Sequence, residues 1–308
     1  GNIRVSRMAW VEQTMLSNQV SGHHEIPPLL GFNFDWRFAY SQAKRDQPDT
    51  REYRYDEEED GSKWLLSDRP EGNQRMYSDL LDNHYDLTAD FRIPFTIGER
   101  EGYGGWGFQV LRRDRAVDTR RFKFKHKGGF ASDPDVTSLD PESVFAPEHI
   151  EPNNFQFEDF TQATDNYTAE QKVDAVYWMG DVPLHHRLRL VGGLRLEHAT
   201  QDTLTFMPFS ADLEPIVANI DNLDPLFGVN VIWDWNDDMG LRFAGSRTVN
   251  RPDFREMSDV VQYDVTGGRM TIGNPELKRA LIWHVDTRWE WYPSPGETVS
   301  VGAFYKHM

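Results

Sequence analysis

Two neighbouring stretches, GLRFAGSRTVNRPDFREMSD at 240–259 and IGNPELKRALIWHVDTRWEWYPSPGETVSVGAFYK at 272–306, carry the clearest structural signals of the chain. Residues 241–249 alternate between apolar and polar side chains, and residues 281–292 form a longer aromatic run of the same kind. Such alternation is typical of a strand with two different faces. The Pro- and Gly-containing sequence at 293–296 predicts a tight turn into a third strand. We therefore expect antiparallel strands joined by one long polar connection and one short turn.

This combination resembles the barrel of TonB-dependent outer-membrane receptors. In that family, a run similar to S-R-T-x-x-R-P-x-F-R-E, here at 246–256, precedes G-N-P-x-L, here at 273–277. A strand, a short turn and a strand ending near F-Y-K follow, here at 304–306. The resemblance extends backward through 192–197 to Leu30, and it weakens at each step. It implies a β-barrel receptor and leaves the ligand open.

Strict alternation recurs in four stretches, at 30–41, 84–95, 187–198 and 281–292. One face of these stretches has no Asp, Glu, Lys or Arg in 24 positions, whereas the other face has 12 in 24. A soluble sandwich with one wet face produces this pattern. A membrane barrel with an apolar outside and a polar lumen produces it too.

Connection lengths separate these two alternatives. Short links near 96–102, 181–186, 236–239 and 293–297 alternate with long polar stretches. In an up-and-down barrel this parity places all short turns at one rim and all long loops at the other, as in bacterial outer-membrane barrels. The barrel is therefore favoured over the sandwich. The long stretches are 43–83, 114–166, 201–226 and 250–279.

We accordingly predict an all-β, antiparallel, up-and-down transmembrane β-barrel with long outer loops, in one partial domain over residues 1–308. About ten strands can be counted, whereas transporters of the resembled type have about 22 around a plugged lumen. The chain would thus lack the N-terminal plug and the closing C-terminal strands. The ten strands are expected near 2–16, 29–42, 84–95, 103–112, 167–180, 187–200, 227–235, 240–249, 279–292 and 297–307.

Bulk composition excludes several classes of protein. The net charge of −17 argues against nucleic acid as the main partner. The absence of cysteine excludes disulfides and thiolate sites. No stretch has the 18 or more consecutive apolar residues of a spanning helix, but barrel strands do not need them. The sequence contains no nucleophile motif, phosphate-binding loop, dinucleotide fingerprint or zinc spacing, so we expect no enzyme activity and no cofactor.

Several local features have simple interpretations. The acidic run 56–60 lacks the ligand spacing of a calcium loop and suits a solvated charged surface. Basic residues at 112–127, alternating with Phe, predict strands that extend beyond the membrane. These basic residues could bind lipopolysaccharide phosphates or an anionic ligand, or they could form a hydrated hairpin balanced by neighbouring acidic residues. The pairs at 23–24 and 185–186 are adjacent histidines, which point to opposite strand faces and rarely share one metal.

Asp286 and Glu290 lie four residues apart on one strand, about 13 Å, which is too far for glycoside hydrolysis. A charged lumen wall explains them better. Aromatic residues near the short turns suit an interfacial belt, with packing in a soluble core as the alternative. These aromatic residues are Trp233, Trp235, Trp289, Trp291 and Tyr292.

The resemblance implies an outer-membrane receptor in a Gram-negative bacterium. Such a receptor takes up a scarce large ligand, namely a ferric siderophore, cobalamin or an oligosaccharide. Implied partners are outer-membrane lipid and lipopolysaccharide, the extracellular ligand and, through the plug, the TonB inner-membrane complex. The alternative is a soluble or surface-exposed carbohydrate-binding module. Ligand contacts are predicted at outer loop residues of anchoring type. They are Trp64, Arg251, Tyr263 and Arg269.

The signature around Arg251 has two interpretations. Pro252 has no N–H to donate, so the strand should leave the wall there and become an outer loop. The charged residues of this signature suit one of two roles. The favoured role is a structural network at the rim, and the alternative is a surface that faces incoming ligand. Arg195 should lie deeper and matter less for first capture. We also predict that Phe34 and Trp36 face away from the concave side of a curved sheet, and that Arg37 faces into it.

Overall fold

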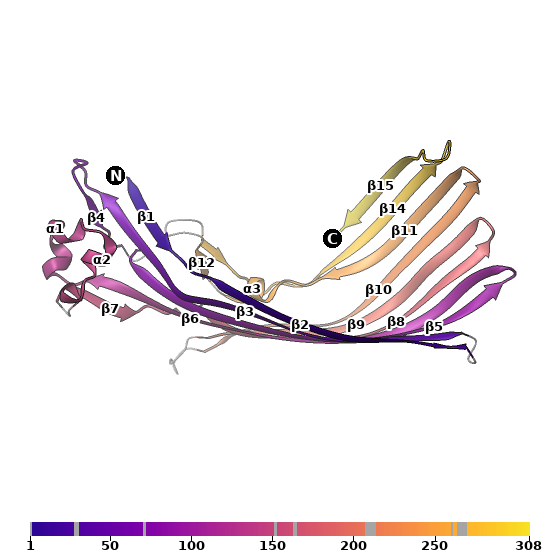
Figure 1. The fold of residues 1–308 in the computed structure, drawn as a ribbon, viewed down its shortest axis with the longest axis horizontal. Coiled ribbons are helices and arrows are strands. Elements are labelled where there is room, and N and C mark those ends of the chain that lie inside the picture. Colours follow the sequence, from indigo (N-terminus) through magenta and orange to yellow (C-terminus); the bar gives the residue numbers. More distant parts are fainter. Residues whose placement is uncertain are drawn as a thin grey trace.

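The computed structural model describes residues 2–27, 31–69, 72–150, 153–162, 165–206, 214–259, 261–263 and 270–308. These residues form one curved antiparallel sheet of 13 strands and a separate two-stranded sheet. Figure 1 shows the large sheet as an open trough whose strands run along its length. The predicted all-β, antiparallel fold class is confirmed.

Ten strands pair in succession across the sheet, and three others pair beside them. In order of pairing, the ten are β1 (Ile3–Met8), β3 (Phe32–Glu57), β5 (Gln74–Ile97), β6 (Arg100–His126), β8 (Asn166–His185), β9 (Leu188–Phe206), β10 (Ile216–Asn236), β11 (Met239–Asn250), β14 (Ala280–Trp291) and β15 (Val299–His307). The others are β2 (Glu12–Ile26) and β4 (Trp64–Leu66), both paired with β3, and β7 (Phe155–Asp159), paired with β6.

The strand predicted near 2–16 is in fact two strands. β1 pairs with residues 51–56 of β3, and β2 pairs with residues 32–46 of the same strand. The chain therefore passes along one edge of β3 in two pieces. All other predicted strands are present, and most are longer than the alternation indicated.

Short turns gather at one end of the trough. The turns at 98–99, 186–187 and 237–238 and the link 292–298 lie together at the right in Figure 1, as the parity of connection lengths predicted. At the other end lie α1 (Pro134–Thr137), α2 (Pro141–Val144), η2 (Gly129–Ser132) and η3 (Pro147–His149). The short two-stranded sheet consists of β12 (Val261–Tyr263) and β13 (Met270–Ile272).

Two of the four predicted long loops, 43–83 and 201–226, are largely strand, and a third, 114–166, begins with strand, which corrects the expectation. β3 extends to residue 57, β5 begins at residue 74 and β6 extends to residue 126. Charged side chains link these extensions, for example Arg75 to Asp49 at 2.6 Å and Arg113 to Asp82 at 2.7 Å. Strands hydrated on both faces need no apolar side, so alternation did not reveal the extensions of β3 and β5. The strand extension predicted over 112–127 is confirmed in β6.

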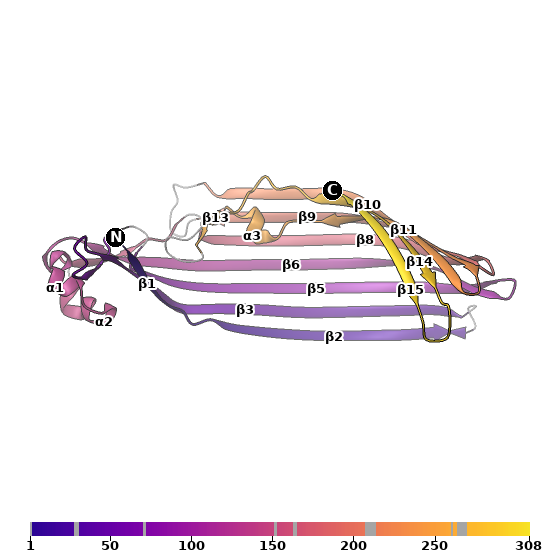
Figure 2. The ribbon, with the colours of Figure 1, turned by 90° about the horizontal axis from the view of Figure 1, so that it is seen from above.

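The two faces of the sheet follow from its register. Residues that pair directly share a face, and α3 (Phe254–Met257) lies over the concave face (Figures 1 and 2). Arg37 hydrogen-bonds inward-facing Asp86, so neighbouring Phe34, Trp36 and Phe38 point outward. With no second large sheet among the described residues, they are not packed in a sandwich. One directly paired outward row is Phe34, Phe91, Trp106, Trp178, Leu194 and Phe227.

The outward face carries an uncharged band. On β10, seven successive outward positions from Leu223 to Trp235 have no charge. They extend about 40 Å along the strand, or about 28 Å across a bilayer at a tilt of about 45°. This matches the apolar height of bacterial membrane barrels. Trp233, Trp235 and Trp291 are exposed on this face near the short turns.

No helix among the described residues is both long and apolar enough to traverse a bilayer.

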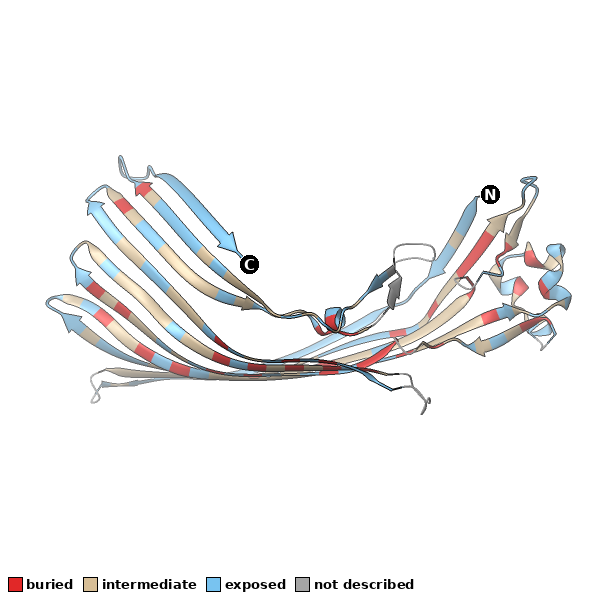
Figure 3. Ribbon diagram, turned by 180° about the vertical axis from the view of Figure 1, so that it is seen from behind, coloured by how far each residue is buried: buried red, intermediate tan, exposed pale blue. Residues whose placement is uncertain are grey.

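The end opposite the short turns has a small hydrophobic core of its own, which we call the outer cap. β4, β7 and the short helices fold over the ends of β3 and β6 (Figure 1), and Figure 3 shows buried residues there. The Tyr55 hydroxyl donates to the Leu139 carbonyl at 2.8 Å, and burial raises the pKa of Tyr55 to about 12. The core consists of Tyr53, Tyr55, Leu66, Phe124, Ala131, Val144 and Phe155.

Candidate ligand-binding surface on the concave wall

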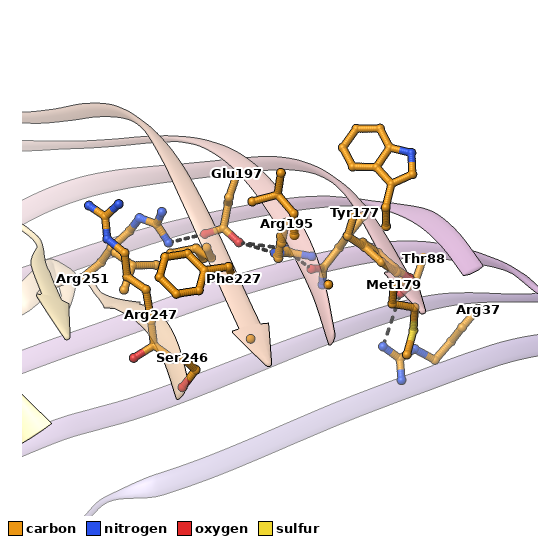
Figure 4. Close-up of a pocket in the computed structure, with 18 residues that line it drawn as sticks. Arg37, Thr88, Tyr177, Met179, Arg195, Glu197, Phe227, Ser246, Arg247 and Arg251 are labelled. Carbon is orange, nitrogen blue, oxygen red and sulfur yellow. Dashed lines mark hydrogen bonds and ion pairs between the residues drawn. The ribbon is translucent and has the colours of Figure 1, made fainter. Parts of the chain in front are cut away.

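A row of polar contacts crosses the concave wall between β3 and β9 (Figure 4). Arg37 of β3 donates to Asp86 of β5 at 3.4 Å, and Gln109 of β6 donates to the same carboxylate at 2.5 Å. Arg195 of β9 donates to Gln109 at 2.8 Å and lies 2.7 Å from Glu197. Inward positions of neighbouring strands are in register, so side chains far apart in sequence form one continuous network.

The network continues onto residues that follow β11 and precede β14. Arg251 donates to Glu197 at 2.5 Å and to Asp224 at 3.1 Å. Arg279 donates to the other oxygen of Asp224 at 2.6 Å and also to Asn222. Asp224 is fully buried, and it binds arginines from both ends of the same connection. We call the described parts of this connection, 251–259, 261–263 and 270–279, the inner segment.

The ion pairs and α3 hold the inner segment on the concave wall. Asp253 caps α3 in a capping box with Glu256, and it also pairs with Arg115 of β6 at 3.1 Å. Phe254 is buried against Tyr167 and other residues of the wall. Burial of this large side chain contributes about 2–3 kcal/mol. This packing on the wall stabilises α3 even though the helix is short.

A groove lies beside this network on the wall. On the concave face it is bordered by guanidinium groups, the ring of Tyr177 and the carboxylate of Glu197, a combination that suits an anionic or hydrogen-bonding ligand. Its principal lining residues on the concave face are Arg37, Tyr177, Arg195, Glu197, Ser246 and Arg251 (Figure 4).

The structure describes three of the four predicted ligand contacts, and these three lie on different parts of the chain's fold. Arg251 is within the network, with both terminal nitrogens in ion pairs. Trp64 is on β4 of the outer cap, where the Arg4 guanidinium lies 5.4 Å from its ring centroid. Tyr263 lies in β12, and Arg269 is outside the described residues. Trp64, Tyr263 and Arg269 therefore stay predictions, as does ligand contact by Arg251.

Sequence reasoning missed several members of the network. Asp224 and Asn222 belong to β10, in a stretch that was expected to be loop. Asp86 and Gln109 lie within two of the predicted strands, but a strand pattern shows which face a residue occupies and not its neighbour across the sheet. Arg279, directly before β14, could have been paired with Arg251 by its mirrored position around the connection.

Other charged groups of the wall form ion pairs with neighbouring side chains. Glu290 pairs with Arg242 at 2.8 Å and with Arg288 at 3.1 Å, consistent with a charged wall. In the basic stretch, Arg112 pairs with Asp174 at 2.8 Å. Within the described ranges, no group of three His, Cys, Asp or Glu side chains could hold a metal ion.

The antiparallel wall has an uncharged outward band, a polar concave face and short turns at one rim. Together these features define an integral β-barrel of the outer-membrane type. The chain belongs to the TonB-dependent receptor-like β-barrel family, whose model matches residues 6–308. No curated protein matches the sequence.

Solved structures show the same fold at low identity. The ferric-catecholate import receptor Fiu from E. coli K12 aligns with a TM-score of 0.57 at 12% identity, covering 96% of this chain and 41% of that one. The siderophore receptor PiuA from Acinetobacter baumannii aligns with a TM-score of 0.57 at 9% identity, covering 96% and 40%. The ferric yersiniabactin uptake receptor FyuA from Yersinia pestis aligns at 0.54 and 11%, covering 97% and 36%. The chain thus spans about two fifths of these receptors.

Proposed function

We propose that this chain is the wall of an outer-membrane receptor that takes up a scarce, large ligand from outside the cell. The observation that carries the proposal is the pairing of an uncharged outward band with a continuous polar network on the concave face. A membrane-spanning wall needs the first and a hydrophilic uptake path needs the second. In such a protein the chain contributes binding and passage, with no covalent chemistry.

The proposal includes the partners of an energy-coupled receptor. The outer edges of β2 and β15 carry unpaired backbone groups in the described sheet, and lipid does not tolerate such edges. Further strands would therefore complete the barrel, and a plug in the lumen would connect it to the TonB inner-membrane complex. Of the ligands considered, ferric siderophores are the first to test, since the matched receptors named above carry that function. Cobalamin and oligosaccharides are the other candidates.

First capture is proposed at the outer end, through Trp64, Arg251, Tyr263 and Arg269. Trp64 stands in the outer cap, and Tyr263 is in the segment that crosses the concave face. Large aromatic and arginine side chains are frequent anchors at binding surfaces. The Arg251 guanidinium is already held by two carboxylates, so its contribution to ligand binding would come through the position of the inner segment.

The test uses the full-length receptor in a strain that lacks its own siderophore receptors. Trp64→Ala and Tyr263→Ala should each weaken binding of a labelled ferric siderophore to cells by about tenfold, with unchanged amounts of folded receptor. Arg112→Gln, which alters a pair on the outward face, is the matched control. If neither variant changes binding and Arg195→Gln abolishes it, capture occurs deeper on the wall. If the wild-type receptor supports no uptake of any of the three ligand kinds, the function itself is wrong.

A further inference from the structure

The backbone ladder between β10 and β11 ends before either strand does. Its last pair is Gly228 with Ser246, whereas β11 continues to Asn250 and is still paired with β14 there. β10 also stays paired with β9 beyond that point, but within the described residues it no longer pairs with β11. We call this interval, residues 224–227 of β10 opposite residues 247–250 of β11, the seam.

Pro225 gives the seam a cause in the sequence. The Arg247 guanidinium of β11 donates to the Pro225 carbonyl at 3.4 Å, so the carbonyl of this residue points toward β11. In an antiparallel strand the N–H and the C=O of one residue point to the same neighbour. Proline has no N–H, so the position that should donate to β11 cannot do so. A side chain bridges the two strands where a backbone hydrogen bond is missing.

The seam lies in the outer half of the uncharged band. Gly228 precedes Asp237 of the short turn by nine residues, about 30 Å along the strand and about 21–24 Å across the membrane at a tilt of about 35–45°. The hydrocarbon core is about 30 Å thick, so the seam begins beyond the midplane, on the side away from the short turns. Lipid offers no hydrogen bonds to unpaired backbone groups, so other parts of the protein have to cover them.

Side chains close the seam from both faces. On the concave face, Arg251 crosses from the end of β11 to Asp224 of β10 at 3.1 Å. On the outward face, Phe227 of β10 packs edge-on against Trp283 of β14, with 5.3 Å between the ring centroids. Arg247 pairs directly with Trp283, and its guanidinium carbon lies 5.6 Å from the same ring. Its Nε is buried with no acceptor in the part of the wall that the structure describes, so this closure is made of weak contacts.

The groove on the concave wall reaches the seam. Its lining continues past the last ladder pair to Arg247, Thr248 and Phe227. Arg195 pairs directly with Leu226 of the seam, so a second guanidinium stands beside the seam on the concave face. The volume of the groove is about 730 Å³, within the range of about 300–1,000 Å³ that is usual for small-molecule sites. At the seam, side chains without a backbone ladder separate this groove from the outward face.

We propose that the seam admits an amphiphilic ligand, an anionic iron chelate that carries an acyl chain, from the outer leaflet into the groove. Trp283 and Leu194 are exposed on the outward face and give the chain an apolar surface. Arg247 at the seam and Arg195 behind it suit the anionic head. The two sides of the seam thus match the two halves of an amphiphile. The inference rests on the proposed function and narrows its ligand class.

The experiment seals the seam after the receptor has folded. Leu226→Cys with Thr248→Cys puts one thiol on each side of the seam, and a short bis-maleimide joins them. Asn230→Cys with Ala244→Cys, a direct ladder pair on the same face, is the matched control. The purified full-length receptor is held in nanodiscs of neutral phospholipid, and empty nanodiscs give the binding due to lipid alone.

Two probes are compared, the radioactive ferric complex of a citrate-hydroxamate siderophore with one dodecanoyl chain and the same complex without the chain. The chain-bearing probe should bind the wild-type receptor about tenfold more tightly than the chain-free probe. Cross-linking the seam should slow association of the chain-bearing probe by about tenfold and leave the chain-free probe unchanged. Arg247→Gln should weaken binding of the chain-bearing probe by about tenfold, and Arg112→Gln should not.

The proposal is overturned if the cross-linked seam admits the chain-bearing probe at the wild-type rate, or if the control cross-link slows it equally. Equal affinity of the wild-type receptor for the two probes would overturn the assignment of an acyl chain. Failure of the proposed function gives a different result, since neither probe would then bind to any form of the receptor. Failure of this inference alone leaves both probes bound, with no effect of the chain or of the sealed seam.

Discussion

At the residue scale, Asp224 is a buried carboxylate that depends on two arginines for its hydrogen bonds. Its side chain is fully buried, and each carboxylate oxygen accepts from a different arginine, Arg251 or Arg279. These arginines begin and end the same connection, so a single carboxylate holds both ends of the inner segment against β10. A buried charge of this kind is stable only while its partners stay in place.

We expect Asp224→Asn to release the inner segment. Removing one partner of a buried ion pair costs about 3–5 kcal/mol, because the remaining charges are left uncompensated. Hydrogen exchange of the full-length receptor should show lost protection at 251–259, with the outer cap unchanged. Asp35→Asn, which removes an exposed partner of His23, is the control and should have no such effect. Full protection in Asp224→Asn would show that α3 packing alone holds the segment.

Gly107 provides a second prediction at this scale. A Cβ there would lie 2.4 Å from the Tyr177 hydroxyl oxygen and 2.5 Å from the Ala89 carbonyl oxygen. Tyr177 also hydrogen-bonds Asp90, so it cannot move without losing that contact. Gly107→Ala should therefore lower the free energy of unfolding by about 1–3 kcal/mol. Gly104→Ala is the control, since nothing lies within 4 Å of its Cβ position. Equal urea midpoints for the two variants would refute this explanation.

At the element scale, the longest strands have one part that matches the bilayer and another part that extends beyond it. β3, β5 and β6 have 26, 24 and 27 residues, far more than the 9–11 that a bilayer requires. Their outer halves are linked by charged pairs and end in the outer cap, whose core is separate from the apolar band. The cap thus depends on ordinary aqueous folding, and its stability should respond to pH.

His126, in the last position of β6, is the basis of the pH prediction. Burial lowers the pKa of His126 below its ordinary value, so the unfolded cap binds the proton more tightly than the folded cap. Stability is then complete above about pH 6.5 and is lost as the pH falls through the lowered folded pKa. Hydrogen exchange at the end of β6, corrected for intrinsic rates, should show protection decreasing between about pH 7 and pH 5.

The control for this prediction is a histidine outside the cap. His126→Phe should abolish the pH dependence while keeping a ring against Phe155, whose centroid lies 4.9 Å from the imidazole. His198→Gln, on the outward face of β9, should leave it intact. A pH dependence that persists in His126→Phe would assign it to the acidic residues of the cap instead.

At the scale of the whole molecule, one face of the wall suits lipid and the other suits water. Its outward band is uncharged over a bilayer-sized height, and its concave face carries the network from Arg37 to Arg279. Neighbouring residues of one strand therefore face opposite environments. The energetic cost of a charge should depend on the face it occupies, more than on its position along the strand.

Val231 and Asn230 of β10 test this difference directly. Val231 is on the outward face six residues before Asp237, about 15 Å above the turn and close to the midplane. Val231→Lys should destabilise the full-length receptor in lipid by about 2–4 kcal/mol. Asn230→Lys, on the concave face, should cost about 1 kcal/mol or less. Reversible urea unfolding in lipid vesicles measures both, and equal effects would contradict the assignment of the two faces.

The amino-acid sequence determined the local features of this protein. Alternation identified the strands and their faces, and the family signature identified the class of fold, because both depend on residues near one another in the chain. Pro252, at the point where the strand pattern ends, also marked the departure of the chain from β11 at Asn250. These predictions needed no knowledge of which strands are neighbours.

Tertiary structure decided the features that depend on pairing across the sheet. The outer halves of β3 and β5 lack strict alternation of apolar and polar residues, so cross-strand pairs such as Arg75 with Asp49 are needed to show that they are strands. The same holds for the network, because Arg251 meets Glu197 and Asp224 only through the register of β9 with β10 and the inward fold of the inner segment. Spacing along the chain contains no information about such contacts until the register is known.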